Sequence, residues 1–190
     1  MAKSLMLLAD GVEEMEAVIV ADVLRRAGVE VTLASVGGTC EITASRGVRL
    51  VADTLLQAVQ PERFDALVIP GGANGVNRLK ADPRVLDLVR GWTAAHKPVA
   101  AVCAGPLVLQ AAGVLNGTRV TSHPSVRQQL AGIAVCDERV VEDGLFITSQ
   151  GPGTSMEFAL ALACRLVGAG TARAVAAGLI LPAGSVLPAA

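Results

Sequence analysis

Apolar runs and amphipathic segments alternate along the chain from its beginning. The run SLMLLA, residues 4–9, predicts a buried strand, and residues 11–28 predict a helix that ends at Gly28. Residues 29–37 predict a second strand. A strand, a helix and a strand in this order predict a βαβ unit, in which the two strands run parallel.

The same alternation continues to the end of the chain. Further strands are predicted at 64–72 and 98–103, two short ones around Arg46-Gly47, and a hairpin with its turn at Asp143-Gly144. Further helices are predicted at 82–97, 105–113, 151–168 and 171–184, with a loose tail after the last. Residues 117–132 predict a strand, a turn and a short helix. Within 151–168, Thr154 and Glu157 have the spacing of a capping box.

This order of elements predicts the fold class and the position of a ligand site. We expect an α/β fold, with a doubly wound, mostly parallel sheet covered by helices on both faces, and one domain over residues 1–190. In such sheets ligands bind beyond the carboxyl ends of the strands. Residues that follow the predicted strands are therefore the candidates for chemistry.

Composition and charge exclude several classes of function. Sixteen basic and seventeen acidic residues, with no basic run, disfavour nucleic-acid binding. The first apolar stretch, Leu5 to Ala9, is too short for a signal or membrane segment, so we expect a cytoplasmic protein. Four scattered cysteines and two histidines disfavour disulfides and a metal site. No phosphate-binding loop is present, and Met156 and Pro152 spoil the one glycine motif, so no nucleotide cofactor is expected.

Cys103 has the most informative sequence setting of the four cysteines. It lies where the strand PVAAVC meets a segment that begins Ala-Gly-Pro and continues as a helix. A nucleophile on such a sharp turn stands above the sheet, and Ala101, Ala104 and Gly105 leave room for the tight backbone. A thiol at a helix N-terminus also favours the reactive thiolate. The alternative reading, a buried packing cysteine, is the better one for the other three thiols.

Glu16 is the second candidate, because helical spacing places it within an apolar face. The other members of that face are Val12, Met15, Ile19, Val20, Val23 and Ala27. Glu13 and Glu14 point elsewhere and are expected to be solvated. Burial should raise the pKa of Glu16, and a protonated acid can donate a hydrogen bond to a thiolate. We therefore expect the pKa of Cys103 to lie well below about 8.5. A partly exposed boundary residue is the alternative reading of Glu16.

Weaker signals come from two loops. His123 follows a predicted strand end, where it could act as a general base or orient a partner, although a turn histidine before proline is common. The segment PGGAN, Pro70 to Asn74, offers consecutive backbone N–H groups that could hold an oxyanion together with the N–H of Ala104. The two glycines could equally form only a tight turn.

Six segments together resemble the ThiJ/PfpI superfamily, and within it the branch of the parkinsonism-associated protein deglycase and its bacterial YajL-like relatives. They are ADGVEEMEAV, ASRGV, VIPGGANG, AAVCAGP, TSHPSV and SQGPGTSMEFALA, and the similarity covers nearly the whole chain. The resemblance implies a flavodoxin-like fold, a homodimer, and a nucleophile and an acid at Cys103 and Glu16. It also implies oxyanion donors at Gly72 and Ala104, a nearby histidine at His123, and anion contacts at Arg26 and Arg46, with Asn74 as a further candidate contact.

The resemblance implies an activity and also alternatives to it. The leading expectation is a cofactor-independent glyoxalase or deglycase that acts on methylglyoxal, glyoxal or their early protein and nucleotide adducts. The first alternative is an oxidative-stress sensor and chaperone that uses the same cysteine. The second is a cysteine-dependent amide or isonitrile hydrolase, which needs sulfur-to-imidazole contact. Ala104 stands where the protease-like branch has histidine, and Ala44 stands where close relatives often have a second cysteine.

Overall fold

Seven strands form one central sheet in the computed structural model, which describes residues 1–181. From edge to edge they are β10 (Val140–Asp143), β11 (Phe146–Ser149), β7 (Val99–Val102), β6 (Ala66–Ile69), β1 (Lys3–Leu8), β2 (Glu30–Ser35) and β5 (Thr54–Leu55). All neighbouring strands are parallel except β10 and β11. The mostly parallel sheet is therefore confirmed. The strand order reverses between β1 and β6, which is where a doubly wound sheet binds ligands.

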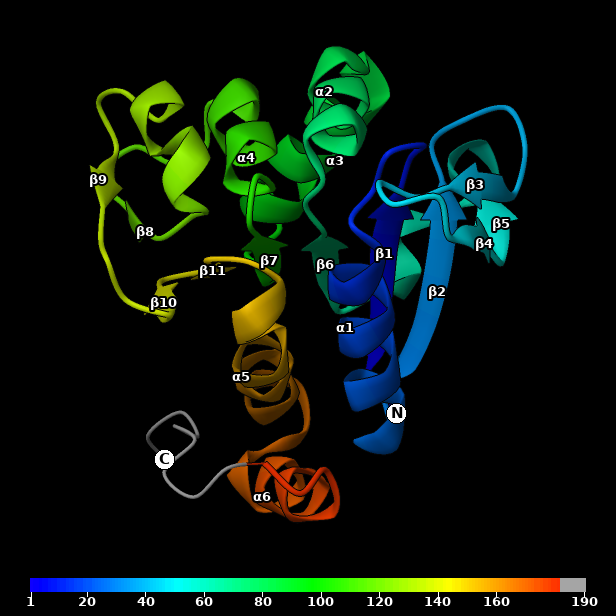
Figure 1. Ribbon diagram of the computed structural model, residues 1–190, viewed down its shortest axis with the longest axis vertical. Coiled ribbons are helices and arrows are strands. Elements are labelled where there is room, and N and C mark those ends of the chain that lie inside the picture. Colours follow the sequence, from blue (N-terminus) through cyan, green and yellow to red (C-terminus); the bar gives the residue numbers. More distant parts are fainter. Residues whose placement is uncertain (182–190) are drawn as a thin grey trace.

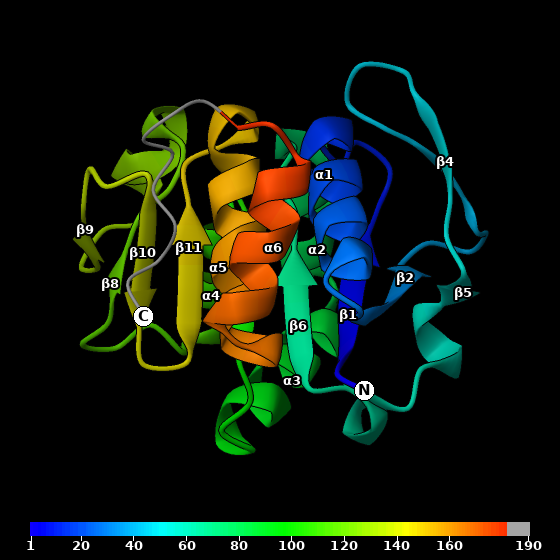
Figure 2. The ribbon, with the colours of Figure 1, turned by 90° about the horizontal axis from the view of Figure 1, so that it is seen from below.

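Helices cover both faces of the sheet, as predicted (Figure 1). One face carries α1 (Glu14–Arg26) and α5 (Ser155–Val167), with α6 (Ala169–Gly178) packed on α5. The opposite face carries α2 (Ala73–Ala81), α3 (Pro83–Ala94) and α4 (Pro106–Ala112). Viewed from below, α1 and α5 lie side by side over the sheet (Figure 2). The result is a three-layer α/β/α sandwich.

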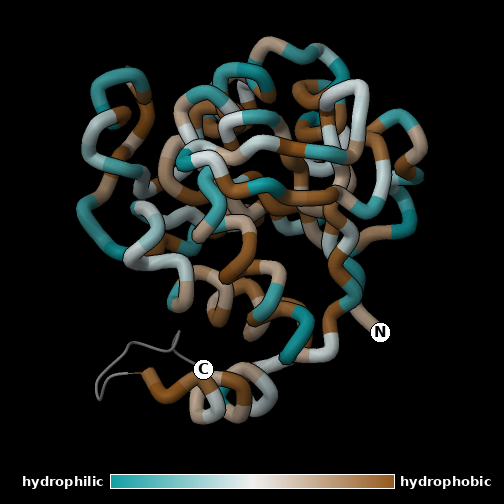
Figure 3. The backbone as a smooth tube through the Cα atoms, turned by 45° about the vertical axis from the view of Figure 1, so that its right-hand side comes forward, coloured by the Kyte–Doolittle hydropathy of each residue, from teal (hydrophilic) through white to brown (hydrophobic). Residues whose placement is uncertain are grey.

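The alternation of side chains along β1 explains why the sheet needs helices on both faces. Met6 and Leu8 belong to the core under α1 and α5, whereas Leu5 and Leu7 belong to the core under α2, α3 and α4. All four side chains are completely buried. Hydrophobic segments lie mainly in the interior of the molecule, while many of the outer loops are hydrophilic (Figure 3). This pattern is typical of a parallel sheet that is buried on both sides.

Shorter strands and helices lie outside the central sheet. The antiparallel hairpin predicted around Arg46-Gly47 is formed by β3 (Glu41–Thr43) and β4 (Arg49–Val51). A two-stranded parallel sheet joins β8 (Arg119–Val120) to β9 (Ala134–Val135). Short 3-10 helices are η1 (Leu56–Ala58), η2 (Pro61–Arg63), η3 (Pro124–Gln129) and η4 (Pro152–Thr154). Within residues 1–181, no helix combines the length and the apolar character that crossing a membrane requires.

Two local expectations about the helices were wrong. The capping box is not formed, because the Thr154 hydroxyl bonds to Gly151 and Ser149 while Glu157 pairs with Arg139. Helix α2 was not predicted, since its sequence ANGVNRLKA contains only two large apolar residues. The last predicted helix is confirmed as α6, but the predicted tail and the segment 182–184 lie outside the described residues.

Candidate functional site

Cys103 lies on a sharp turn between β7 and α4. Its backbone φ of 63° is in the left-handed region, which is strained for a residue with a side chain. The Cys103 N–H donates to the carbonyl of Ser149 on the neighbouring strand (2.9 Å). A Cβ on Gly105 would lie 2.6 Å from the carbonyl oxygen of Ile69, so the turn needs glycine there. The predicted elbow geometry is present, and its cysteine is half-buried.

Glu16 lies beside this thiol in the first turn of α1 and is completely buried. Its Oε2 accepts the N–H of Gly71 (2.6 Å), whereas its Oε1 has no hydrogen-bonding partner among the described residues. Glu13 caps the helix by accepting the N–H of Glu16 (2.8 Å). The predicted position of Glu16 at the carboxyl edge of the sheet is therefore confirmed.

Gly71 permits the carboxylate and the thiol to meet. A Cβ on Gly71 would lie 2.6 Å from Glu16 Oε2, 2.6 Å from Cys103 Cβ and 3.0 Å from Cys103 Sγ. Real side chains do not approach so closely. The sequence pattern Gly-Gly after a strand indicated this loop. It did not predict that Gly71 must lack a side chain so that Glu16 and Cys103 can lie close together.

Burial raises the pKa of Glu16 to about 7, as expected in direction. Hydrogen bonds from Gly71 and Cys103 act against this rise, and the negative charge of Glu13 adds to it. Burial also raises the pKa of Cys103 to about 12, with the charge of the Glu16 carboxylate as the second cause. The N–H groups of Gly72 and Ala104 act in the opposite direction but do not compensate.

The expectation of a thiol pKa well below its usual value is therefore contradicted. The prediction from sequence assumed that Glu16 is protonated and donates a hydrogen bond to the sulfur. When Glu16 is ionised, its negative charge instead disfavours a second negative charge on the sulfur. Between about pH 7 and pH 12 the two groups share one proton. Thiolate then arises when this proton passes from sulfur to Glu16, with no change in the net charge of the pair.

The other predicted residues near the sulfur contact the Cys103 residue mainly through their backbone N–H groups. The N–H groups of Gly72 and Ala104 point to the sulfur of Cys103. The N–H of His123 donates to the carbonyl of Cys103 (3.0 Å), and its Nδ1 lies 2.7 Å from the hydroxyl of Ser125. Among the described residues, no hydrogen bond joins the His123 imidazole to the thiol. The ring instead lies against Gly151.

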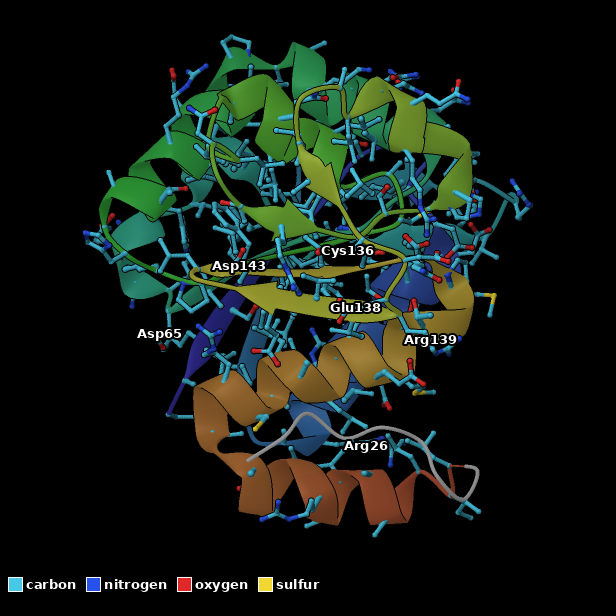
Figure 4. All side chains as sticks on the ribbon, turned by 90° about the vertical axis from the view of Figure 1, so that its left-hand side faces the viewer. Arg26, Asp65, Cys136, Glu138, Arg139 and Asp143 are labelled. Carbon is cyan, nitrogen blue, oxygen red and sulfur yellow. The ribbon has the colours of Figure 1, made fainter. Side chains whose placement is uncertain are left out.

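The predicted anion contacts are not assembled around the pair within one chain. Arg26 ends α1 and pairs with Asp22, about a helix length away from Glu16. Figure 4 shows Arg26 at the end of the molecule that carries α6. The Arg46 guanidinium is exposed and donates to the carbonyl of Ser45. Asn74 is exposed in the first turn of α2, where its Cβ lies against Gly11. Within one chain Arg26 therefore does not lie beside the pair, and its expected anion contact stays a prediction.

Glu14 is a structural residue that the sequence argument placed in solvent. It is buried, and it accepts the Ser45 hydroxyl and the Arg46 N–H, both at 2.8 Å, from the β3–β4 hairpin. Burial opposes its charge, but these bonds and those from the N–H groups of Glu14 and Val48 lower its pKa overall. Met15, expected on the buried face, is half exposed instead.

We expect Glu14→Ala to loosen the hairpin and to lower the free energy of unfolding by about 1–3 kcal/mol, because two donors lose a charged acceptor. Urea unfolding gives the energy, and hydrogen exchange over residues 41–51 gives the location. Glu41→Gln is the matched control, since Glu41 pairs with Arg49 only at the exposed surface. Equal stability of the two variants would contradict this role.

Other features of the described chain are weaker candidates for a functional role than this site. A cavity of about 480 Å³ lies between η2 and α3, and none of the candidate residues line it. All four cysteines are free thiols. Within residues 1–181, no three His, Cys, Asp or Glu side chains gather as metal ligands would.

The site combines a strand-to-helix cysteine, a buried helix glutamate and backbone donors at the switch point of the sheet. These features define a class of doubly wound α/β proteins in which a thiol and a buried carboxyl lie side by side. The chain belongs to the DJ-1/PfpI family, whose model matches residues 2–165. Protein dj-1beta of Drosophila melanogaster is 45% identical over 184 residues, which cover 95% of this chain and 98% of that protein. Its crystal structure superposes with a TM-score of 0.92, at 43% identity and with 95% and 98% of the two chains covered.

Two further relatives bear on activity. The glutathione-independent glyoxalase DJR-1.2 of Caenorhabditis elegans is 36% identical over 166 residues, with 86% of this chain and 88% of that protein covered. A solved structure of Toxoplasma gondii DJ-1, described as oxidized, has a TM-score of 0.91 at 38% identity, with 95% and 98% of the chains covered.

Proposed function

We propose that this protein is a cofactor-independent glyoxalase that converts 2-oxoaldehydes such as methylglyoxal and glyoxal into 2-hydroxy acids. The observation that carries the proposal is the Cys103–Glu16 pair, a thiol and a buried carboxyl that share one proton near neutral pH. A relative named as a glutathione-independent glyoxalase supports the same reaction class.

The first step of the proposed reaction forms a hemithioacetal. The Cys103 proton passes to Glu16, and the thiolate adds to the aldehyde carbon. The carbonyl electron pair moves onto oxygen, where the N–H groups of Gly72 and Ala104 stabilise the negative charge. Glu16 then returns its proton to this oxygen.

The next steps move a proton and add water. The Glu16 carboxylate removes the hydrogen of the former aldehyde carbon, and an enediolate forms with its negative charge on the oxygen of the neighbouring carbon. Return of that proton to the neighbouring carbon, with passage of the hydroxyl proton from the first oxygen to the second, yields a thioester of the 2-hydroxy acid. Water hydrolyses the thioester and releases the acid and the thiol. One carbon is oxidised and its neighbour reduced, so the reaction consumes only water.

Early adducts of 2-oxoaldehydes on proteins or nucleotides would enter the same path once the bond from the former aldehyde carbon to the protein or nucleotide breaks. This releases the amine or thiol and restores the carbonyl to which the thiolate adds, which gives the proposed deglycase activity. His123 would assist at the imidazole nitrogen that Ser125 does not engage, and the exposed side chains of Arg46 and Asn74 would contact an anionic group of the substrate. The sequence alternative of an amide or isonitrile hydrolase is less well supported, since neither Ala104 nor the His123 imidazole supplies a base on the sulfur.

The direct test is lactate release from methylglyoxal without glutathione. We expect turnover by the wild type and by Cys136→Ser, a matched control at another half-buried thiol. Cys103→Ala should show none above background. Wild-type turnover no faster than that of Cys103→Ala would refute the proposal.

The proposed reaction has a defined pH dependence. We expect kcat/KM to rise as pH increases through about 7, because the pair must lose one proton before the sulfur can form a thiolate. Glu13→Gln should move this midpoint to lower pH, since the charge of Glu13 raises the pKa of Glu16. Glu30→Gln, on the exposed surface beside Lys3, should leave the midpoint unchanged. If the midpoint of kcat/KM is the same in Glu13→Gln and the wild type, the assignment of this titration to Glu16 is contradicted.

A redox sensor is the second candidate function, and the oxidized Toxoplasma gondii relative favours it. Peroxide would convert the Cys103 thiolate to a sulfenate and water, and a second equivalent would give a sulfinate, to which a protonated Glu16 could donate. Mass spectrometry after mild peroxide, with turnover measured on the same sample, separates this function from the enzyme. A chaperone activity would be a consequence of this state.

We further propose a homodimer and a cytoplasmic location. Exposed apolar side chains on α1 and β4 support the dimer: Met15, Val18 and Val51. Sedimentation of Val18→Glu against the wild type would test it. Four free thiols support a reducing compartment.

A further inference from the structure

The loop between β11 and α5 lies near one carboxylate oxygen of Glu16, Oε1, whereas Gly71 donates to the other, Oε2. Its residue Gly151 is buried, and a Cβ placed there would lie 3.4 Å from His123 Cδ2 and 4.0 Å from Glu16 Oε1. Glu16 Oε1 is the carboxylate oxygen without a hydrogen-bonding partner. The backbone at Gly151 therefore forms a wall beside Oε1, an oxygen that solvent does not reach.

One hydroxyl holds this wall in place. Thr154 is buried, and its Oγ1 accepts the N–H of Gly151 (3.0 Å) and lies 2.9 Å from the carbonyl of Gly151. It also lies 2.6 Å from the hydroxyl of Ser149. Ser149 donates its own proton to the carbonyl of Arg139 (2.8 Å), so its oxygen is free to accept from Thr154.

The same network is connected to the nucleophile. The carbonyl of Ser149 accepts the backbone N–H of Cys103 (2.9 Å). Ser149 thus binds the turn that carries the thiol through its backbone, and the wall over the carboxylate through its side chain. The end of β11 sets the position of both groups at once. Figure 4 shows Arg139, the acceptor for Ser149, at the start of α5 beside this loop.

We propose that Thr154 is a positioning residue, whose hydroxyl clamps Gly151 against Glu16 and His123 and so keeps water away from the unpartnered oxygen of Glu16. The clamp rests on the proposed function only for its effect on turnover. Its effect on the thiol follows from the position of the loop beside Glu16 and does not depend on the reaction that the thiol performs.

The consequence of releasing the clamp depends on the groups that face Glu16. These are Glu13 from the start of α1, Cys103 from the elbow, and His123 across Gly151, together with the N–H of Gly71. Burial is the largest cause of the raised pKa of Glu16. Water at Oε1 would stabilise the carboxylate, which would then be a weaker base for the proton of Cys103.

The test measures the rate of Cys103 alkylation by iodoacetamide as a function of pH, with modified Cys103 quantified by mass spectrometry. In Thr154→Val we expect the midpoint to move from about 7 toward lower pH by about one unit, and the plateau rate to fall. Thr154→Ser keeps the hydroxyl and should restore both values. Thr154→Ala provides a second hydroxyl-free variant if valine does not fold.

Two variants of the same loop serve as controls. Ser155→Ala removes another buried hydroxyl that donates to Gly151, but the N–H of Thr154 still donates to the same carbonyl. A Cβ on Gly153 meets nothing within 4 Å, so Gly153→Ala changes the loop without filling space. Both should titrate like the wild type. Wild-type profiles in folded Thr154→Val and Thr154→Ala would overturn the proposal.

Turnover measurements distinguish this inference from the proposed function. If methylglyoxal is not converted by any variant but the alkylation profile moves, the glyoxalase proposal fails and the clamp stands. If turnover is normal and the alkylation profiles of Thr154→Val and Thr154→Ala match the wild type, the role of Thr154 is refuted and the glyoxalase proposal is supported.

Discussion

The Glu16→Gln protein is expected to be more stable than the wild type above pH 7. Glu16 is completely buried, and its pKa is raised from 4.5 to about 7. Below about pH 4.5 the acid is protonated in both the folded and the unfolded chain, so it has no differential effect. Between these two values ionisation favours the unfolded chain, and above 7 the loss stays constant.

The size of this effect follows from the shift in pKa. A shift from 4.5 to about 7 corresponds to roughly 3 kcal/mol as an upper value, or an increase of several degrees in Tm for a chain of this length. Glutamine can still accept the N–H of Gly71. Thermal unfolding between pH 4 and 8.5 should show curves that coincide at the acidic end and diverge above it. A constant difference at all pH values would show that ionisation is not the cause.

The same variant is expected to lose most of its turnover, by at least about 100-fold, because an amide cannot carry the proton between carbons. Its thiol should also titrate differently. In the wild type the ultraviolet signal of the thiolate should rise mainly near pH 12, because the proton lost near pH 7 comes from Glu16. In Glu16→Gln it should appear in one step below 12, because the carboxylate charge is gone. One identical step in both proteins would show that the two groups are independent.

Gly71→Ala is expected to abolish the site with an effect comparable to that of Cys103→Ala. The added Cβ would meet Glu16 Oε2 and Cys103 Cβ at 2.6 Å, so the carboxylate and the elbow must move apart. Crowding of this kind costs about 1–3 kcal/mol of stability, while a displacement of about 1 Å costs about 100-fold in rate. Gly91→Ala on α3 is the control, since its Cβ meets nothing within 4 Å.

Three readouts check this result. Circular dichroism establishes that the variant is folded, lactate release measures turnover, and iodoacetamide measures the reactivity of Cys103. We expect a folded protein with little turnover and altered alkylation. More than half of the wild-type turnover would show that the pair tolerates separation.

The order of strands and helices was predictable from the sequence because it depends on local patterns. The alternation of Val-, Leu- and Ala-rich runs with amphipathic segments predicted β1, β2, β6 and β7 and the helices that follow β1 and β7. Helix α2 was not predicted because its apolar pattern is weak. Its orientation is set by Val76 and Leu79, which pack in the core on this face of the sheet. Tertiary contacts, rather than propensity, stabilise such a helix.

Part of the site was also predictable. The small residues around Cys103 predicted the elbow, and helical spacing predicted the burial of Glu16. Both follow from the period of one element and from the rule that parallel strands share a carboxyl edge. The same reasoning was wrong for Glu14 and Met15, because the β3–β4 hairpin covers one and leaves the other exposed. A helical period cannot show what another segment will cover.

Sequence by itself therefore determined the sheet, the elbow and the partners of the proton pair, since each depends on residues close in the chain or on the direction of strands. The tertiary structure alone decided the charge of that pair, the distance of Arg26 and the clamp at Thr154. A pKa depends on the water and charges within a few ångströms, and these come from segments far apart in sequence. Gly71 and Gly151 lie on two separate loops and Glu16 on a helix, and only folding brings the three close together.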